Sequence, residues 1–281
     1  MRTLIMHALA LGAVGASTAL GGGGETVVTF ENGNEGFSLN GWDVTSPTGG
    51  NPGAHLHWQN FIDNFGMSLR TDTNPAFLGD LSRYGQIEMG VDVLVNFIEF
   101  FGTPVTREWV LELRDYDNVT TGYPYVSVWY NLGTLPTNSE DGWVRFSTQF
   151  DPTQTELPPG WGGYGDEDPN TFEPILPADR TFADVLEGVD EVVFTTFVPG
   201  FFYGFTNFDL QVDNVTIRSV NAGCNEADFA EPFGSLDFSD VTAFLGAFGA
   251  GDASADLAEP FGSFDFSDVA AFLAAFGSGC P

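Results

Sequence analysis

A regular alternation of apolar and polar side chains limits what this chain can fold into. Between residues 86 and 95, Ile, Met or Val occupies every odd-numbered position, while polar residues or Gly occupy the even-numbered positions up to Asp92. The segment 108–114 repeats the pattern, its inward positions being Trp109, Leu111 and Leu113. Because successive side chains of a strand point to opposite faces, both segments are expected to be strands with one buried and one solvated face.

Further strands are expected at 26–31, 124–130, 142–150, 191–197 and 207–218. The 35 Gly and 16 Pro supply turns between them, so the pattern favours a mainly β fold, a β-sandwich. Only 182–188 has a helical pattern in this region. The apolar positions change parity at Asp213-Asn214, which predicts a β-bulge there.

The charge balance excludes some classes of partner. The chain carries 8 Lys+Arg against 39 Asp+Glu, a formal net charge of −31. Such a charge repels nucleic acid and anionic membrane surfaces. Disorder is also disfavoured, because 43% of the residues are hydrophobic and 28 are Phe.

The N-terminus, residues 1–21, is typical of a signal peptide. Arg2 supplies the positive end, residues 4–14 form the apolar run, and small residues at 17–19 offer a cleavage site. No later apolar run approaches the 18 or more residues that span a bilayer, so no transmembrane segment is expected. The sequence therefore predicts a secreted protein, extracellular or at the cell surface.

The C-terminal tail contains an internal repeat with a period of 28 residues: the segment 227–241 recurs at 255–269. Each copy is expected to be a loop followed by a helix, whose N-cap is Asp237 or Ser239 in the first copy and Asp265 or Ser267 in the second. The expected apolar stripes of the two helices are Val241, Phe244, Leu245 and Phe248, and Val269, Phe272, Leu273 and Phe276. Two facing stripes would form a small two-helix core.

Cys224 and Cys280 are the two cysteines, and they flank this core. In an oxidising compartment they are expected to form a disulfide, worth roughly 4 kcal/mol in the chain-entropy model. Two free thiols are the alternative.

Acidic loops that enter duplicated helices between two cysteines resemble dockerin-type modules, most closely the GC-type dockerin-like anchors of secreted planctomycete proteins. The resemblance implies two EF-hand-like calcium loops and a docking protein partner. The loops are degenerate, because Ala230 and Pro232 stand where oxygen ligands are needed. The remaining candidate ligands are Asp228, Asp237, Asp240, Asp256, Asp265 and Asp268. The alternative is that these acids cap helices and solvate the tail.

Four segments of the main domain carry a second resemblance: 37–42, 51–56, 74–85 and the closing Val212-Asp-Asn-Val-Thr-Ile217. Together they resemble a laminin B (laminin type IV) module covering 25–218, joined by a linker at 219–223 to the dockerin-like domain at 224–281. The resemblance implies a galactose-binding-like jelly roll, a fold that many carbohydrate-binding modules share.

In jelly-roll carbohydrate-binding modules, the meeting point of the first and last strands often holds a structural calcium. Glu31 and Asp213 lie at the corresponding positions of this chain, and carboxylates are ligands that Ca²⁺ prefers. We therefore expect a structural Ca²⁺ there. The alternative is two solvated acids at strand ends.

A long Gly/Pro-rich loop at 156–180 offers an aromatic and acidic surface for glycan binding. Its candidate residues are Trp161, Tyr164, Asp166 and Asp168, and the facing half of the platform would come from Tyr123, Tyr125 and Trp129. The alternative is that these aromatic rings plug one end of the sandwich.

No catalytic constellation is visible in the sequence. Glu108 and Glu112 share a strand face, but four residues of strand separate them by about 13 Å, more than either glycosidase mechanism uses. The predicted function is non-enzymatic binding of an extracellular glycan or matrix polymer. One alternative is a polysaccharide hydrolase or lyase, which needs carboxylates from different strands roughly 5–10 Å apart. The other is a coat component with an exposed assembly patch.

Overall fold

The computed structural model describes residues 24–41, 45–59, 64–140, 142–221, 225–230, 233–258 and 263–280. The chain separates into two compact units between residues 223 and 224. The predicted signal peptide at 1–21 and Cys224 lie outside the described residues, so the cleavage site and the Cys224–Cys280 disulfide stay predictions. No helix in the described part of the chain is long and apolar enough to cross a membrane.

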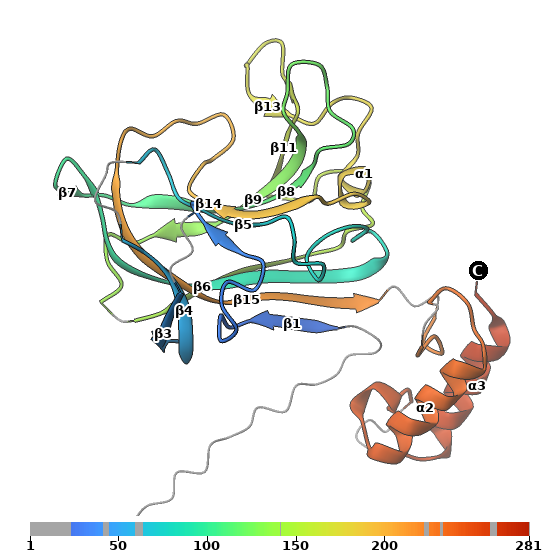
Figure 1. The fold of residues 1–281 in the computed structure, drawn as a ribbon. Helices are drawn as coiled ribbons and strands as arrows, with labels where there is room; N and C mark the ends of the chain where they lie inside the picture. The colour runs from blue at the N-terminus through green and yellow to red at the C-terminus, as the bar shows by residue number, and fades with distance from the viewer. Residues whose placement is uncertain are drawn as a thin grey trace, which may run out of the picture. The chain divides into compact units, whose positions relative to one another are not determined.

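The first unit is a jelly-roll β-sandwich, as predicted, in which two antiparallel sheets face each other (Figure 1). One sheet has the order β10-β6-β15-β4-β3, with β1 beside β15 and β7 beside β6. Its strands are β10 (Val144–Phe150), β6 (Tyr84–Phe100), β15 (Asn207–Asn221), β4 (Gly53–Gln59), β3 (Thr45–Gly50), β1 (Glu25–Val28) and β7 (Thr103–Pro104).

The second sheet has six strands in the order β11-β9-β8-β14-β5-β2. They are β11 (Trp161–Tyr164), β9 (Val126–Leu135), β8 (Arg107–Asp115), β14 (Glu191–Thr195), β5 (Ser68–Thr71) and β2 (Ser38–Leu39). A small hairpin of β12 (Asp166–Glu167) and β13 (Pro174–Ile175) and the helix α1 (Phe182–Leu186) complete the unit.

The core lies between the sheets and contains the apolar faces expected from the alternation. The odd-numbered side chains of β6 from Ile87 to Val95 are at most 2% exposed, and Trp109, Leu111 and Leu113 of β8 are fully buried. The predicted bulge is confirmed: the β15–β6 register shifts between Asp213 and Thr216, and Asn214 has a φ of 48°. Strands β2, β3, β4, β5 and β7 were not predicted, because they are short or rich in Gly, Pro and polar residues. The segment 156–180, expected to be a loop, contains the short strands β11, β12 and β13.

The second unit is a small helical domain, also as predicted. Helices α2 (Phe238–Ala250) and α3 (Phe266–Ser278) pack through Phe244 and Phe272, whose rings stack at 4.1 Å with an interplanar angle of 9°. Asp237 and Asp265 are the N-caps.

The stripe predicted for each tail helix is wrong at one position. Leu245 and Leu273 are 55% and 56% exposed. The buried core consists of the two stacked phenylalanines with Ala227 and Ala255, which precede the helices. The partly buried side chains packed against it include Phe229, Val241 and Val269 but not Leu245 or Leu273.

Candidate functional site

The outer face of the six-stranded sheet, the side turned away from the sandwich core, gathers aromatic and charged side chains. Its register aligns two neighbouring rows of residues across the strands. One row consists of Glu191, Arg114, Ser127 and Tyr164, and the other of Arg70, Val193, Glu112, Trp129 and Gly162.

Arg114 is the centre of a buried ion-pair network on this face. Its guanidinium donates to Glu112 Oε2 at 2.9 Å through Nε and to Glu191 Oε2 at 2.8 Å through Nη1. Burial works against the charge of Arg114, but Glu112 and Glu191 more than offset it and raise the Arg114 pKa above its ordinary value. The Ser127 hydroxyl donates to Glu112, and the Tyr116 hydroxyl donates to Glu191, both at 2.7 Å.

The expectation that Glu112 is solvated is therefore wrong. Its side chain is only 1% exposed, because Arg114 binds it and the ring of Tyr125 packs on Arg114 at 4.3 Å. The sequence did contain a signal for the network: a strand with Glu and Arg two residues apart on one face. The position of Glu191, its partner from β14, carried no such signal.

A tyrosine cluster (Tyr116, Tyr123, Tyr125 and Tyr164) borders this network. Ring centroids lie 5.6 Å apart for Tyr116–Tyr125, 5.1 Å for Tyr125–Tyr164 and 5.4 Å for Tyr123–Tyr164. Burial, then the negative charge of Glu112, raises the pKa of Tyr125 above its ordinary value. The structure thus brings together Tyr125 and Tyr164, two candidates from separate halves of the predicted platform.

Trp129 lies on the same face, next to Glu112 in the register. Its indole occupies the space that a Cβ on Gly162 would need, so only glycine lets the ring lie against β11. The indole Nε1 donates to Gly163 O at 3.4 Å. The side chain is half-buried, and one side of its ring lies against β11.

Trp161 does not belong to this surface. Its side chain is 9% exposed and points inward, where its ring centroid lies 4.9 Å from Phe150 and 5.0 Å from Phe182. For Trp161 the alternative interpretation, an aromatic ring that fills the sandwich, is therefore the correct one. Sequence alone could not distinguish the two roles, because glycines on the next two positions hide the strand's alternation.

The two loop acids serve the β12–β13 hairpin. Asp168 Oδ1 accepts backbone N–H groups of Asn170 at 2.7 Å and Thr171 at 3.0 Å, and these bonds lower the Asp168 pKa. Asp168 therefore closes the hairpin turn. Asp166 Oδ1 accepts the N–H of Glu167 at 2.8 Å. Desolvation, then the charges of Glu167 and Asp166, raises the pKa of the Tyr123 hydroxyl.

Glu31 and Asp213, the candidate calcium ligands, converge on the loop between β3 and β4. Glu31 Oε1 accepts the Ala54 N–H at 2.9 Å, and Asp213 accepts the Asn51 N–H. Asp213 is fully buried; burial, then the charges of Asp92 and Glu31, raises its pKa to about 6. A Cβ at Gly53 would collide with Glu31 Oε1, so this loop is shaped around the carboxylates.

These residues fit a hard cation, since Ca²⁺ would relieve the repulsion between the buried carboxylate of Asp213 and the exposed carboxylate of Glu31. Within the described residues, no group of three or more His, Cys, Asp or Glu side chains could hold a metal ion. Glu31 and Asp213 would therefore need backbone carbonyl or water oxygens as further ligands.

The tail acids are hydrogen-bonded to backbone amides. Asp240 accepts the N–H groups of Ala230 at 2.8 Å and Asp237 at 2.7 Å, and Asp268 accepts those of Ala258 and Asp265 at 2.9 Å. The remaining candidates are Asp228, which accepts the Gly234 N–H at 2.6 Å, and its repeat equivalent Asp256. This pattern favours helix capping over metal binding, and calcium in these loops stays a prediction.

Comparison with known proteins found similarity only to solved structures. No family model matches the sequence, and no curated protein matches it, so the laminin-B-like and dockerin-like resemblances stay expectations. The structure is similar to the C-terminal family 22 carbohydrate-binding module of Clostridium thermocellum Xyn10B (15% identity, 70% of this chain and 94% of that chain, TM-score 0.37).

Two further solved structures are similar to this chain, with comparably low sequence identities and TM-scores. A family 11 carbohydrate-binding module from Clostridium thermocellum has 12% identity over 74% of this chain and 92% of its own, with a TM-score of 0.34. An exo-β-agarase has 11% identity over 69% of this chain and 24% of its own, with a TM-score of 0.38. Values this low carry no conclusion about function.

Proposed function

We propose that this chain is a secreted, non-enzymatic glycan-binding protein, and that the outer face of the six-stranded sheet is its binding surface. The observation that carries the proposal is the arrangement of Trp129 and the tyrosine cluster around the Arg114 network. Aromatic rings offer stacking surfaces for sugar rings, and hydroxyl and charged groups between them bond sugar hydroxyls.

The same network argues for binding rather than hydrolysis. Glu112 and Glu191 come from adjacent strands, as the hydrolase alternative requires, but Arg114 lies between them and binds both. A glycosidase needs a water or a glycosidic oxygen in that position. The pair is therefore better suited to hold the face rigid than to transfer protons.

The coat-component alternative has one observation in its favour, an exposed phenylalanine patch on the segments that precede β5 and β15. Phe65 lies 5.1 Å from Phe202 and 4.1 Å from Phe205 between ring centroids, and Phe202 is 71% exposed. Such a patch is typical of an assembly surface. It is compatible with glycan binding, because it does not include the Trp129 surface.

Export, anchoring and the disulfide complete the proposal. The signal peptide at 1–21 would send the chain out of the cell, where the Cys224–Cys280 bond is stable. The helical tail would then serve as an anchor or as the docking site for a partner protein. The sandwich would present the glycan-binding face, at the cell surface or in the surrounding matrix.

Ca²⁺ at Glu31 and Asp213 is proposed as a structural brace. Millimolar Ca²⁺ should raise the sandwich's melting temperature by about 5 °C at neutral pH. Because the Asp213 pKa is raised to about 6, the metal-free protein should lose stability as the pH rises through that value. The calcium effect should shrink below it, as protons compete for Asp213.

Glu31→Gln tests this assignment by scanning fluorimetry with Ca²⁺ or EDTA. The variant keeps an acceptor for the Ala54 N–H but loses the charge, so the calcium-induced rise should disappear. Glu25→Gln, which removes one exposed charge from β1, is the matched control. A rise in Glu31→Gln as large as in the wild type would exclude this site.

Trp129→Ala tests the glycan-binding face. In affinity gel electrophoresis against a panel of neutral and acidic polysaccharides, at least one polymer should retard the wild type. Trp129→Ala should bind that polymer about tenfold more weakly, because it loses the stacking ring. The control is Phe101→Ala, which removes a 76% exposed ring in the turn between β6 and β7 of the other sheet. An equal loss in the two variants would contradict the proposal.

A further inference from the structure

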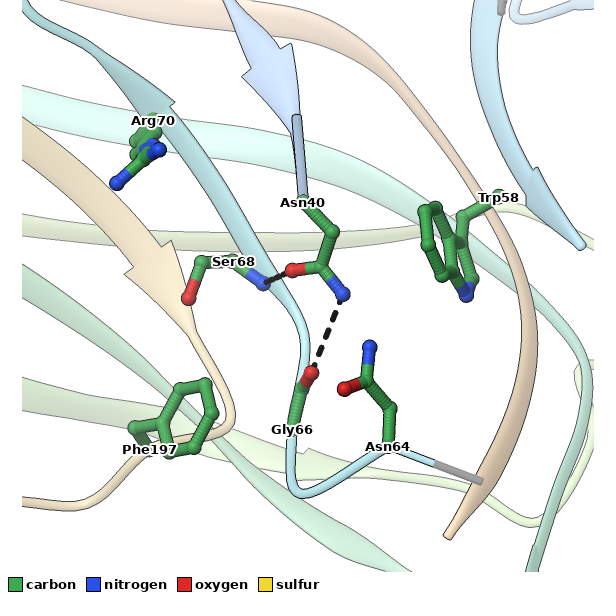
Figure 2. A pocket seen from close by; sticks show the side chains of 7 residues that line it. All are labelled: Asn40, Trp58, Asn64, Gly66, Ser68, Arg70 and Phe197. Atoms are coloured by element: carbon green, nitrogen blue, oxygen red, sulfur yellow. Dashed lines mark hydrogen bonds between the residues drawn. The ribbon is translucent and has the colours of Figure 1, made fainter. Parts of the chain in front are cut away.

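A separate pocket lies at the β2–β5 edge of the same sheet, with a volume of about 410 Å³. This volume lies within the range of about 300–1,000 Å³ that is typical of small-ligand pockets. Figure 2 shows Arg70 and Phe197 on one side and Trp58 on the other, with the polar residues between them. The complete lining is Asn40, Trp58, Asn64, Gly66, Ser68, Arg70 and Phe197.

The walls combine aromatic rings with neutral polar groups. The Phe197 ring lies against Gly66, where a Cβ would come within 2.8 Å of Cζ, and its side chain is 42% exposed. Asn40 fixes the floor: its Oδ1 accepts the Ser68 N–H at 2.7 Å and its Nδ2 donates to Gly66 O at 3.2 Å (Figure 2). A ring backed by glycine beside amide and hydroxyl groups suits a sugar unit.

Arg70 adds a positive charge that a neutral sugar would not need. Its side chain is 52% exposed, and its one ion pair among the described residues is to Glu191 Oε1 at 3.7 Å. Glu191 is already bonded by Arg114 and by the Tyr116 hydroxyl, so Arg70 is not required to neutralise it. Most of the five N–H donors of the Arg70 guanidinium therefore remain available to a ligand.

Building on the proposed glycan-binding function, we propose that this pocket binds a sugar unit carrying one anionic group, a carboxylate or a sulfate ester. Either group presents two oxygens to the guanidinium of Arg70, a geometry that arginine prefers. Three strand spacings, about 14 Å, separate the Trp129 backbone on β9 from that of Arg70 on β5. One oligosaccharide can therefore contact both, and the net charge of −31 favours a ligand with few charges over a polyanion.

Calorimetric titrations with three probes test the pocket: a galactan oligomer ending in a single galacturonate unit, the methyl ester of that oligomer, and a galactan oligomer carrying a single sulfate ester. The wild type should bind the acid form, the sulfated form or both at least about tenfold more tightly than the methyl ester. Arg70→Gln should bring that ratio close to one. Arg83→Gln removes the same charge from an exposed arginine outside the pocket and should leave the ratio unchanged.

The outcomes separate this inference from the proposed function. A charge preference that survives in Arg70→Gln, or one that Arg83→Gln also removes, overturns the assignment of Arg70. If neutral polysaccharides bind through Trp129 and no charged probe is preferred, the pocket inference fails and the proposed function stands. If no polysaccharide binds the wild type, both fail.

Discussion

Replacing Arg114 by Met should lower the free energy of unfolding of the sandwich by about 3–5 kcal/mol, because removal of one member of a buried ion network leaves the others uncompensated. Glu112 is 1% exposed and Glu191 5% exposed, so water cannot replace the lost guanidinium. The effect should appear as a lower midpoint in urea unfolding followed by tryptophan fluorescence.

A triple variant distinguishes this electrostatic effect from simple loss of packing. A variant that combines Arg114→Met with Glu112→Gln and Glu191→Gln removes the two carboxylate charges that would otherwise lack a partner. It keeps acceptors for the Ser127 and Tyr116 hydroxyls. It should recover most of the stability lost in the single variant. If the triple variant is no more stable than Arg114→Met, the buried charges are not the cause.

Phe272→Ala should unfold the helical tail at temperatures where the sandwich is intact. The fully buried core of the tail is small: Ala227, Phe244, Ala255 and Phe272. Removing one of two stacked rings should therefore cost about 3–5 kcal/mol, comparable to the whole stability of so small a core. The expected signal is loss of helical circular dichroism.

Tryptophan fluorescence provides the internal reference, because all six tryptophans precede residue 162 and report on the sandwich. The fluorescence transition of Phe272→Ala should match the wild type. Leu273→Ala is the matched control, since that neighbouring side chain is 56% exposed and should cost little. Equal effects of the two substitutions would mean that the stacked pair does not hold the tail together.

Local patterns predicted much of the fold. Alternation at 86–95 identified the core face of β6, since a period of two determines which side chains face inward. The parity change at Asp213-Asn214 located the bulge for the same reason. The 28-residue repeat predicted both tail helices and their caps. However, the helical period did not show that Leu245 lies outside the core that the phenylalanines form.

The candidate site was less predictable, because it depends on strand pairing between distant segments. Arg114 and Glu191 are 77 residues apart, and only the β8–β14 register places them together. The aromatic platform was partly predicted: Tyr125 and Tyr164 meet, whereas Trp161 belongs to the core. Arg70 offered no sequence signal, since its role comes from the pocket around it.

Hydrogen–deuterium exchange of the intact protein, with and without the polysaccharide that binds it best, tests the central claim most directly. Glycan binding at the outer face of the six-stranded sheet predicts slower exchange in β5, β8, β9, β11 and the loop 116–125. Exchange in β10 and β3, the strands at the two ends of the order of the seven-stranded sheet, and in the tail should not change. Protection confined to that other sheet or to the tail would contradict the account.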